Sequence, residues 1–479
     1  MSSVVEPAVR VEAIDDLSCF RMELYDCLEA RGDALFELVE AMLCIDGPVV
    51  SVPELSLAGV HRRGHGGLYE ALASGRMNVA RFAAVLAALP LPRMRGRIVL
   101  AVDVSPWLRP DAECCDERMF CYVHGRGSGN AQMIPGWPYS FVAALESGAS
   151  SFTALLDAVR IGPDDDGTEV TAAQVRDVVT RLIAAGQQRA GDPPIRIVLD
   201  SGYDGTRLAW LLADLPVELL VRVRSDRVFC APPGPRKGQR PGRLPRHGPR
   251  MKLNDDSTWP QADAEARIDT VRYGAARIDG YSRRHQRLAG DGAWAGHSGE
   301  YPIIDGALLR VVVDRLPGDR SPKPLWLWSS VPEVCAADLA GLFYSFCRRF
   351  DIEHTFRMIK QTLGWTRPRI RTAAAGELWT ALVIAAYTQL RLARPLAADL
   401  RRAWEKPVTD PARLTPARVR RGFRRLRRIL PNPARPPIAG RPGPGRPKGS
   451  KNKNRAPRHD VGKRTKTSGG TATAAPPPP

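Results

Sequence analysis

Residues 1–95 show the apolar spacing of helices. Leu17, Phe20 and Leu24 recur every three or four positions, and a second region with this spacing covers residues 67–89. Apolar side chains at this spacing form one face of a helix, which can pack against another element. The pattern therefore predicts a helical N-terminal domain in residues 1–95.

From residue 97 the pattern changes to short, β-rich apolar runs that alternate with helical stretches. Residues 97–103 and 195–200 are such runs, and each ends in an aspartate. Between them, residues 171–185 have helical spacing, with Thr171 at the position of an N-cap. This alternation is typical of an α/β domain with a mixed sheet, and residues 96–223 are assigned to its first part.

The alternation is interrupted after residue 223. Residues 224–335 contain a Pro/Gly/Arg-rich stretch and several β-rich runs, which predict a β-leaning insertion subdomain. Helical spacing returns in residues 336–363 and again in residues 378–392. Residues 336–400 are therefore expected to complete the α/β domain that the insertion divides.

The last part of the chain differs from the rest in charge. The net charge is +19, and residues 401–479, with 22 Lys/Arg against three Asp/Glu, hold all of that excess. Seven arginines from Arg418 to Arg428 lie beside an apolar stripe, which predicts a basic helix within residues 401–430. Residues 431–479 are rich in Pro, Gly, Lys and Arg, cannot bury a core, and are expected to form a disordered basic tail.

The basic C-terminal region suggests contact with DNA. A helix of this charge can lie along the phosphate backbone, with Arg424 and Arg428 as candidate contacts. Residues 445–449 resemble the core of an AT-hook, in which an extended arginine enters the narrow minor groove, so Arg446 and Lys448 are candidates too. The alternatives are unspecific attraction to phosphates and a role in solubility alone.

Composition excludes several classes of protein. Hydrophobic residues make up 44% of the chain, enough for a sizeable core, but there is no apolar run of about 18 residues that would predict a membrane span. The N-terminus lacks the pattern of a signal peptide, and the nine cysteines form no CxxC pair. We expect a cytoplasmic protein with reduced thiols. The cluster of Cys114, Cys115, Cys121 and His124 matches no zinc-binding spacing.

Two aspartates are candidates for chemistry because of their place after predicted strands. Asp103 and Asp200 each follow a buried run, and ligands of open α/β sheets bind at the carboxyl ends of strands. Two carboxylates brought together there would repel each other and favour a divalent cation such as Mg²⁺ or Mn²⁺. The alternative is that each aspartate only caps the turn that follows it.

A third acid lies on a predicted helix. Steps of three, four and seven residues bring Phe346, Arg349, Glu353 and Lys360 to one face. A solvated face with an Arg349–Glu353 ion pair would also explain the charges. That explanation accounts less well for the alignment of an aromatic ring with the charges, or for basic residues on both sides of the acid.

The series Phe346, Arg349, Glu353 and Lys360 resembles the tyrosine–arginine–glutamate–lysine signature of DDE transposases from bacterial insertion sequences. In that family the signature follows two aspartates at strand ends, and Asp103 and Asp200 resemble them; the second is followed by a Gly-Tyr pair that ends at Tyr203. The resemblance covers roughly residues 97–400. It implies a ribonuclease-H-like mixed sheet with a β-rich insertion. At the signature tyrosine this chain has a phenylalanine, which keeps the ring and lacks the hydroxyl.

The resemblance also implies an activity. Asp103, Asp200 and Glu353 would be catalytic and would hold two Mg²⁺ ions per site, for which Mn²⁺ can substitute, to cleave DNA and transfer strands. Arg349 and Lys360 would contact phosphates. Further expected DNA contacts are Arg348, Tyr203 and Lys323.

The implied partners are double-stranded DNA, as transposon inverted repeats and as target, and a second copy of the chain in the DNA complex. The implied location is the bacterial cytoplasm, at the nucleoid. Two other functions remain open at this point: a ribonuclease-H-like nuclease outside transposition, and a transposase-derived DNA-binding protein without catalytic activity. The presence of all three acids argues against the second.

Overall fold

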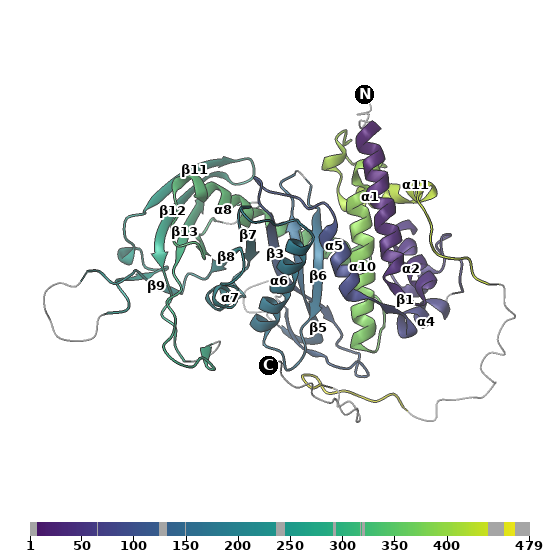
Figure 1. The fold of residues 1–479 in the computed structure, drawn as a ribbon, viewed down its shortest axis with the longest axis horizontal. Coiled ribbons are helices and arrows are strands. Elements are labelled where there is room, and N and C mark those ends of the chain that lie inside the picture. Colours follow the sequence, from purple (N-terminus) through teal and green to yellow (C-terminus); the bar gives the residue numbers. More distant parts are fainter. Residues whose placement is uncertain are drawn as a thin grey trace.

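The fold is α/β, built on one large mixed sheet in a computed structural model of the chain (Figure 1). The structure describes residues 7–64, 66–123, 132–148, 150–235, 245–290, 294–316, 318, 321–438 and 455–464. No helix in these ranges is both long enough and apolar enough to cross a membrane.

Helices come first along the chain, and strands dominate its middle. The N-terminal helices are α1 (Pro7–Asp26), α2 (Gly32–Cys44), α3 (Val52–Leu55), α4 (Gly66–Ser74) and α5 (Val79–Ala88). The later helices are α6 (Gly167–Ala184), α7 (Gly205–Leu211), α8 (Ala336–Arg348), α9 (Phe350–Gln361), α10 (Ala373–Ala393) and α11 (Pro416–Leu426).

Five strands form the part of the sheet that holds the candidate site. They are β3 (Val99–Leu108), β5 (Gln132–Leu145), β6 (Thr153–Arg160), β7 (Ile195–Leu199) and β8 (Val217–Val223). Their order is β6–β5–β3–β7–β8, with β3, β7 and β8 parallel and the other pairs antiparallel. This is a ribonuclease-H-like arrangement, as the sequence predicts.

The strands of the insertion extend the same sheet. They are β11 (Ala264–Thr270), β12 (Gly274–Arg284), β13 (Gly306–Val313) and β14 (Leu325–Ser329), and β14 pairs with β8. With β4 (Met119–Val123) at the other end, ten strands of the described chain form one sheet. Among the described residues, two small antiparallel sheets lie outside it, formed by β1 (Leu28–Ala30) with β2 (Arg76–Met77) and by β9 (Val228–Cys230) with β10 (Arg250–Lys252).

The two faces of the sheet bury separate sets of side chains. Successive side chains of a strand point to opposite faces, so on β3 the residues Val99 and Ala101 join one apolar cluster and Leu100 and Val102 join the other. Helices α6 and α7 cover the second face, and α8, α9 and α10 cover the first. In Figure 1, α6 lies in front of the strands, while α10 runs beside α1.

The N- and C-terminal helices share one core around α10. Arg21 of α1 is fully buried and donates hydrogen bonds to Gln389 of α10 (2.7 Å) and to the carbonyl oxygen of Pro431 (2.9 Å). Arg420 of α11 is buried as well and donates to the carbonyl oxygen of Met42 in α2 (2.8 Å). A buried guanidinium is stable only where its donors find acceptors, so these bonds fix the terminal helices to each other.

The structure differs from the predicted elements in several places. Strand β3 continues five residues beyond Asp103, because β5 pairs with it along its whole second half. Helix α6 begins at Gly167 with Asp166 as its N-cap, and Thr171 lies inside it, where its hydroxyl donates to the Gly167 carbonyl. Strand β6 was not predicted, and β2 interrupts the helical region 67–89.

Parts of the predicted tail contact the folded body. Arg62 donates a hydrogen bond to the Ala434 carbonyl (2.8 Å), and Arg464 pairs with Asp165 (2.8 Å). Residues 439–454 and 465–479 lie outside the described residues, so the expectation of disorder stays a prediction for them.

We expect Trp365→Ala to destabilise the fold by about 3–5 kcal/mol, the usual cost of deleting a buried tryptophan. The Trp365 ring is fully buried against Tyr139 and Phe141, and its indole donates to Thr380 Oγ1 (2.9 Å). The measurement is the urea midpoint followed by far-ultraviolet circular dichroism. Trp404→Ala is the control, because that side chain is 77% exposed and its loss should change stability by less than about 0.5 kcal/mol.

Candidate active site

The register of two parallel strands brings the two aspartates to the same level. Ala101 of β3 pairs with Val198 of β7, and each aspartate lies two residues further along the chain, Asp103 within β3 and Asp200 directly after the end of β7. Side chains two residues apart point to the same face. Asp103 and Asp200 therefore leave the sheet side by side, on the face that α9 covers.

The third acid reaches this point from the helices above the sheet. Ile352, Phe356 and Ile359 of α9 are buried in the cluster on that face. Phe356 contacts Phe141, the β5 partner of Asp103, with ring centroids 5.2 Å apart. This packing turns the Glu353 side of α9 toward the strand ends.

Arg349 joins the three acids. It is the residue between α8 and α9, and its side chain is only 3% exposed. The guanidinium lies 3.3 Å from an Asp103 oxygen, 3.8 Å from an Asp200 oxygen and 3.1 Å from a Glu353 oxygen. The sequence pattern predicts the Arg349–Glu353 pair; the structure adds both aspartates to it.

Aromatic rings hold Arg349 in place. Its guanidinium carbon lies 5.9 Å from the centroid of the Phe346 ring and 5.0 Å from that of Phe350. A cation over an aromatic face is attracted by the ring quadrupole. Phe346, at the signature tyrosine position, is buried in the core below the arginine.

Burial makes Asp103 costly to ionise. It raises the pKa of Asp103 to about 6, and the Arg349 charge opposes this shift. Asp200 Oδ1 is buried and, within the described ranges, accepts no hydrogen bond; its nearest cation is the Arg222 guanidinium at 3.5 Å. Such an oxygen has free coordination capacity.

Tyr203 belongs to the same group. Burial raises the pKa of its hydroxyl well above the usual value, and the charges of Asp103 and Asp200 act in the same direction, while that of Arg349 opposes them. Its hydroxyl oxygen is buried and has no hydrogen-bond partner in the described part of the chain.

Lys360 lies on α9, about two turns beyond Glu353. Its ammonium is 5.6 Å from the Trp365 ring centroid. Burial lowers its pKa to about 8, and the thiol of Cys121 and the carboxylate of Asp103 oppose that shift. Lys360 is therefore within electrostatic reach of the acids.

Basic side chains line a cavity next to Asp200. Arg222, Arg224 and Lys323 are among its lining residues, together with Ser201, which directly follows the aspartate. Arg348 lies elsewhere, although it is adjacent to Arg349 in sequence. It pairs with Asp351 (2.6 Å) and donates to the Ser150 carbonyl (2.7 Å), so the structure does not bring it to the acids.

The arginines of α11 divide into two groups. Arg418, Arg420, Arg421 and Arg427 bond to the body of the protein, through Asp399, the Met42 carbonyl, Glu405 and Glu40. Arg424, Arg425 and Arg428 are exposed, and among the described residues the ion-pair partner of Arg424 is the exposed Asp46 (3.5 Å). Arg446 and Lys448 lie outside the described residues.

The donor set of the acidic group suits a hard divalent cation. It consists of carboxylate oxygens, including the buried Asp200 Oδ1, which are the ligands that Mg²⁺ and Mn²⁺ prefer. Arg349 balances the negative charge at the point where the acids converge. The residues present therefore fit a metal-dependent reaction.

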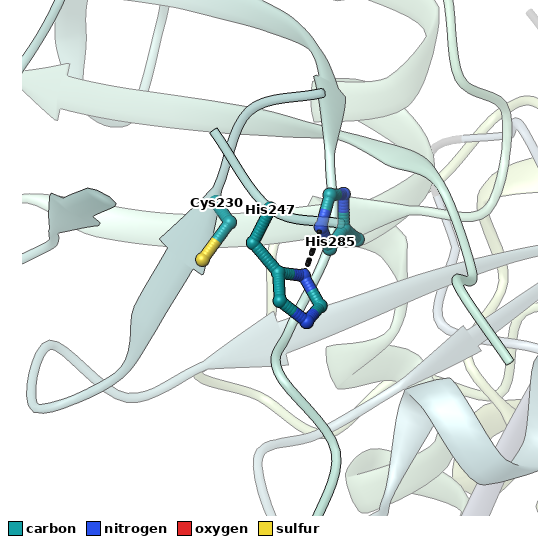
Figure 2. Close-up of side chains that lie close together, drawn as sticks. All are labelled: Cys230, His247 and His285. Carbon is teal, nitrogen blue, oxygen red and sulfur yellow. Dashed lines mark hydrogen bonds between the residues drawn. The ribbon is translucent and has the colours of Figure 1, made fainter. Parts of the chain in front are cut away.

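A second group of potential ligands was not predicted. Among the described residues, Cys230, His247 and His285 bring one sulfur and two nitrogens within 4.8 Å of one another (Figure 2). They lie at positions 230, 247 and 285, so no short spacing motif in the sequence predicts the group. In the group that the sequence does place close together, Cys115 instead donates to the Ile370 carbonyl (3.1 Å), and His124 lies outside the described residues.

A ribonuclease-H-like sheet with three acids gathered beside basic side chains defines a protein of the nuclease class. A family model described as DDE superfamily endonuclease matches residues 23–286, more than half of the chain. The chain belongs to this family. No curated protein matches the chain.

Family membership gives the general chemistry. It supports DNA cleavage of the nuclease or transposase type, and nucleases of this superfamily generally use divalent metal ions. The match includes Asp103 and Asp200 and ends before Glu353. The place of Glu353 in the site therefore rests on its position beside Arg349.

We expect Arg349→Met to destabilise the metal-free protein by about 3 kcal/mol, since it leaves three acids facing one another without their shared cation. The measurement is urea denaturation at neutral pH and low salt. Arg357→Met is the matched control, because Arg357 is exposed on α9, the helix that begins directly after Arg349. Its loss should change stability by less than about 0.5 kcal/mol. Equal stability of the two variants would contradict the bridging role of Arg349.

Proposed function

We propose that this protein is a transposase that cleaves DNA and transfers strands at the ends of an insertion sequence. The observation that carries the proposal is the convergence of Asp103, Asp200 and Glu353 on one buried guanidinium at the sheet edge. Support also comes from the family match and from the spacing that resembles the transposase signature.

Asp103, Asp200 and Glu353 would hold the catalytic Mg²⁺, two ions per site, with Mn²⁺ able to substitute. When bound, such ions supply nucleophile activation and leaving-group stabilisation for an in-line phosphoryl displacement. The strands fix the two aspartates and α9 fixes the glutamate, so the ligands are held on rigid elements.

Arg349 and Lys360 would position the DNA backbone at this point. The planar guanidinium can hold two phosphate oxygens at once, and the ammonium acts as a point charge. The Tyr203 hydroxyl is a further donor within the group. Arg222, Arg224 and Lys323 extend the positive surface beyond Asp200, which gives the backbone a path away from the acids.

The other proposed contacts lie outside the acidic group. Exposed Arg424 on α11 and Arg428 in the 3-10 turn directly after it, with Arg446 and Lys448 of the tail, would recruit DNA through its phosphates. The N-terminal helices would bind the DNA ends. Two ends must be brought together for transposition, so we propose a homodimer in the DNA complex, acting at the bacterial nucleoid.

Two other functions are alternatives to transposition. A nuclease outside transposition would use the same acids, and a regulatory DNA-binding protein would use only the basic surface. The convergence of all three acids favours an enzyme over the regulator.

Asp103→Asn, Asp200→Asn and Glu353→Gln should each abolish cleavage and leave DNA binding intact, because each removes a carboxylate charge without changing side-chain shape. The measurement pairs a gel assay for cleavage in Mg²⁺ with a binding assay in Ca²⁺. Asp214→Asn is the matched control, since Asp214 is exposed and pairs with Arg176. A triad variant that cleaves like the wild type would remove that residue from the site.

The same assay distinguishes the three functions when the substrate is DNA that carries the sequences flanking the gene. A transposase cleaves at inverted repeats and joins the released ends to target DNA. Cleavage without preference for these ends would favour the nuclease, and binding without cleavage would favour the regulator.

Removal of residues 439–479 should weaken DNA binding and flatten its salt dependence, because the segment holds ten Lys/Arg and one Asp. Each lost phosphate contact lowers the slope of log K against log salt by about 0.9. Cleavage at saturating DNA should not change. An unchanged slope would exclude the tail from binding, and the full-length variant Arg446→Ala/Lys448→Ala tests for A·T preference alone.

A further inference from the structure

Cys230 and His285 form a directly opposed pair at the base of the insertion. The Cys230 amide donates to the His285 carbonyl (2.7 Å), and the His285 amide donates to the Cys230 carbonyl (3.0 Å). Residues paired in this way on antiparallel strands project their side chains to the same face. Both side chains are almost fully buried, with 2% and 1% of the residue exposed.

His247 joins the pair because of a close backbone approach. The next residue is Gly248, whose amide donates to the Ala231 carbonyl (2.8 Å). A Cβ at Gly248 would overlap the Pro232 carbonyl oxygen, so only glycine permits this approach. His247 Nδ1 then lies 2.9 Å from His285 Nε2, and Figure 2 shows both rings beside the Cys230 side chain.

An acid fixes the orientation of one ring. His285 Nδ1 lies 3.0 Å from Asp305 Oδ1, directly before β13. A carboxylate that accepts from one imidazole nitrogen directs the lone pair of the other outward, as is usual for metal-binding histidines. Here that lone pair belongs to Nε2, which faces His247.

We propose that Cys230, His247 and His285 bind Zn²⁺, with the Cys230 thiolate, His247 Nδ1 and His285 Nε2 as ligands and solvent as the fourth. Sulfur and imidazole donors in a tetrahedral set favour zinc over magnesium. The two nitrogens are 2.9 Å apart. Two ligands of a tetrahedral zinc at 2.0–2.1 Å are about 3.3 Å apart, so a small widening admits the ion.

The charges around the site favour a set with one thiolate. Arg250 and Arg287 act on Cys230, and Arg246 acts on His247. These cations would repel a dication held by neutral ligands alone, so the thiolate charge is required for binding.

The zinc would fasten three segments of the insertion to one another. It would join the end of β9, the approach to β10 and the end of β12, three segments far apart in sequence. Gln286, directly after His285, accepts a hydrogen bond from Thr206 Oγ1 (3.3 Å), in the first turn of α7, the helix that follows Asp200 along the chain. The ion would thus stabilise the base of the insertion, which contacts α7 through Gln286, without taking part in the reaction at the acidic group.

The test is the zinc content of the purified full-length protein after dialysis, measured by mass spectrometry. We expect about one zinc ion per chain in the wild type, held by the one thiolate and the two imidazoles. Cys230→Ala and His285→Ala should lose it. The controls Cys19→Ala and His297→Ala should keep it, because Cys19 is exposed on α1 and His297 lies in the same subdomain within an aromatic group. Zinc that persists in the two cluster variants would overturn the proposal.

Two further measurements do not depend on the folding of those variants. Cobalt-substituted wild type should show a thiolate-to-cobalt charge-transfer band, and the absence of that band would overturn the proposal. Asp305→Asn, at a carboxylate that is 37% exposed, should bind zinc about 10–100-fold more weakly in chelator competition. An unchanged affinity would contradict the assigned ligand geometry. None of these readouts requires DNA cleavage, so they stand apart from the proposed transposase function.

Discussion

The parallel pairing of β3 with β7 is the constraint on which the candidate site depends. Strand pleating allows only two directions for each side chain, and the register Ala101–Val198 gives both aspartates the same direction and the same level. A shift of one residue would turn one of them to the opposite face, among the apolar side chains below α6. The buried side chains on both faces fix that register. The packing of the sheet therefore also determines where the two aspartates lie.

Arg349 makes this geometry stable in the absence of a bound ion. Three carboxylates brought together would repel one another, and a buried arginine without acceptors would cost free energy. The ion pairs between Arg349 and the three acids remove both costs. The two phenylalanine rings hold the guanidinium in a position from which it contacts all three acids. Phe346 makes this contact with its ring, for which no hydroxyl is needed.

The sequence predicts the features that local patterns encode. The apolar runs before Asp103 and Asp200 and the steps from Arg349 to Lys360 are of this kind, and they suffice for the fold class. Non-local pairing decides the rest. The continuation of β3 depends on β5, and the union of insertion and core depends on the β14–β8 pair. Arg348 lies away from the acids because the chain turns between α8 and α9, and Cys230, His247 and His285 meet only through the folded backbone.

The burial of Arg21 has a consequence for the time at which the chain can fold. Its donors need acceptors on α10 and at Pro431, which is 410 residues further along. At synthesis rates of about 5–20 residues per second, α1 waits about 20–80 s on the ribosome before its last partner has been made. Until then the guanidinium can pair with Glu40 of α2, but the two donors that Pro431 satisfies lack that acceptor, so the terminal helices assemble after translation of α11. The newly made protein therefore completes its scaffold as a late event, after the strands that hold the aspartates have already emerged.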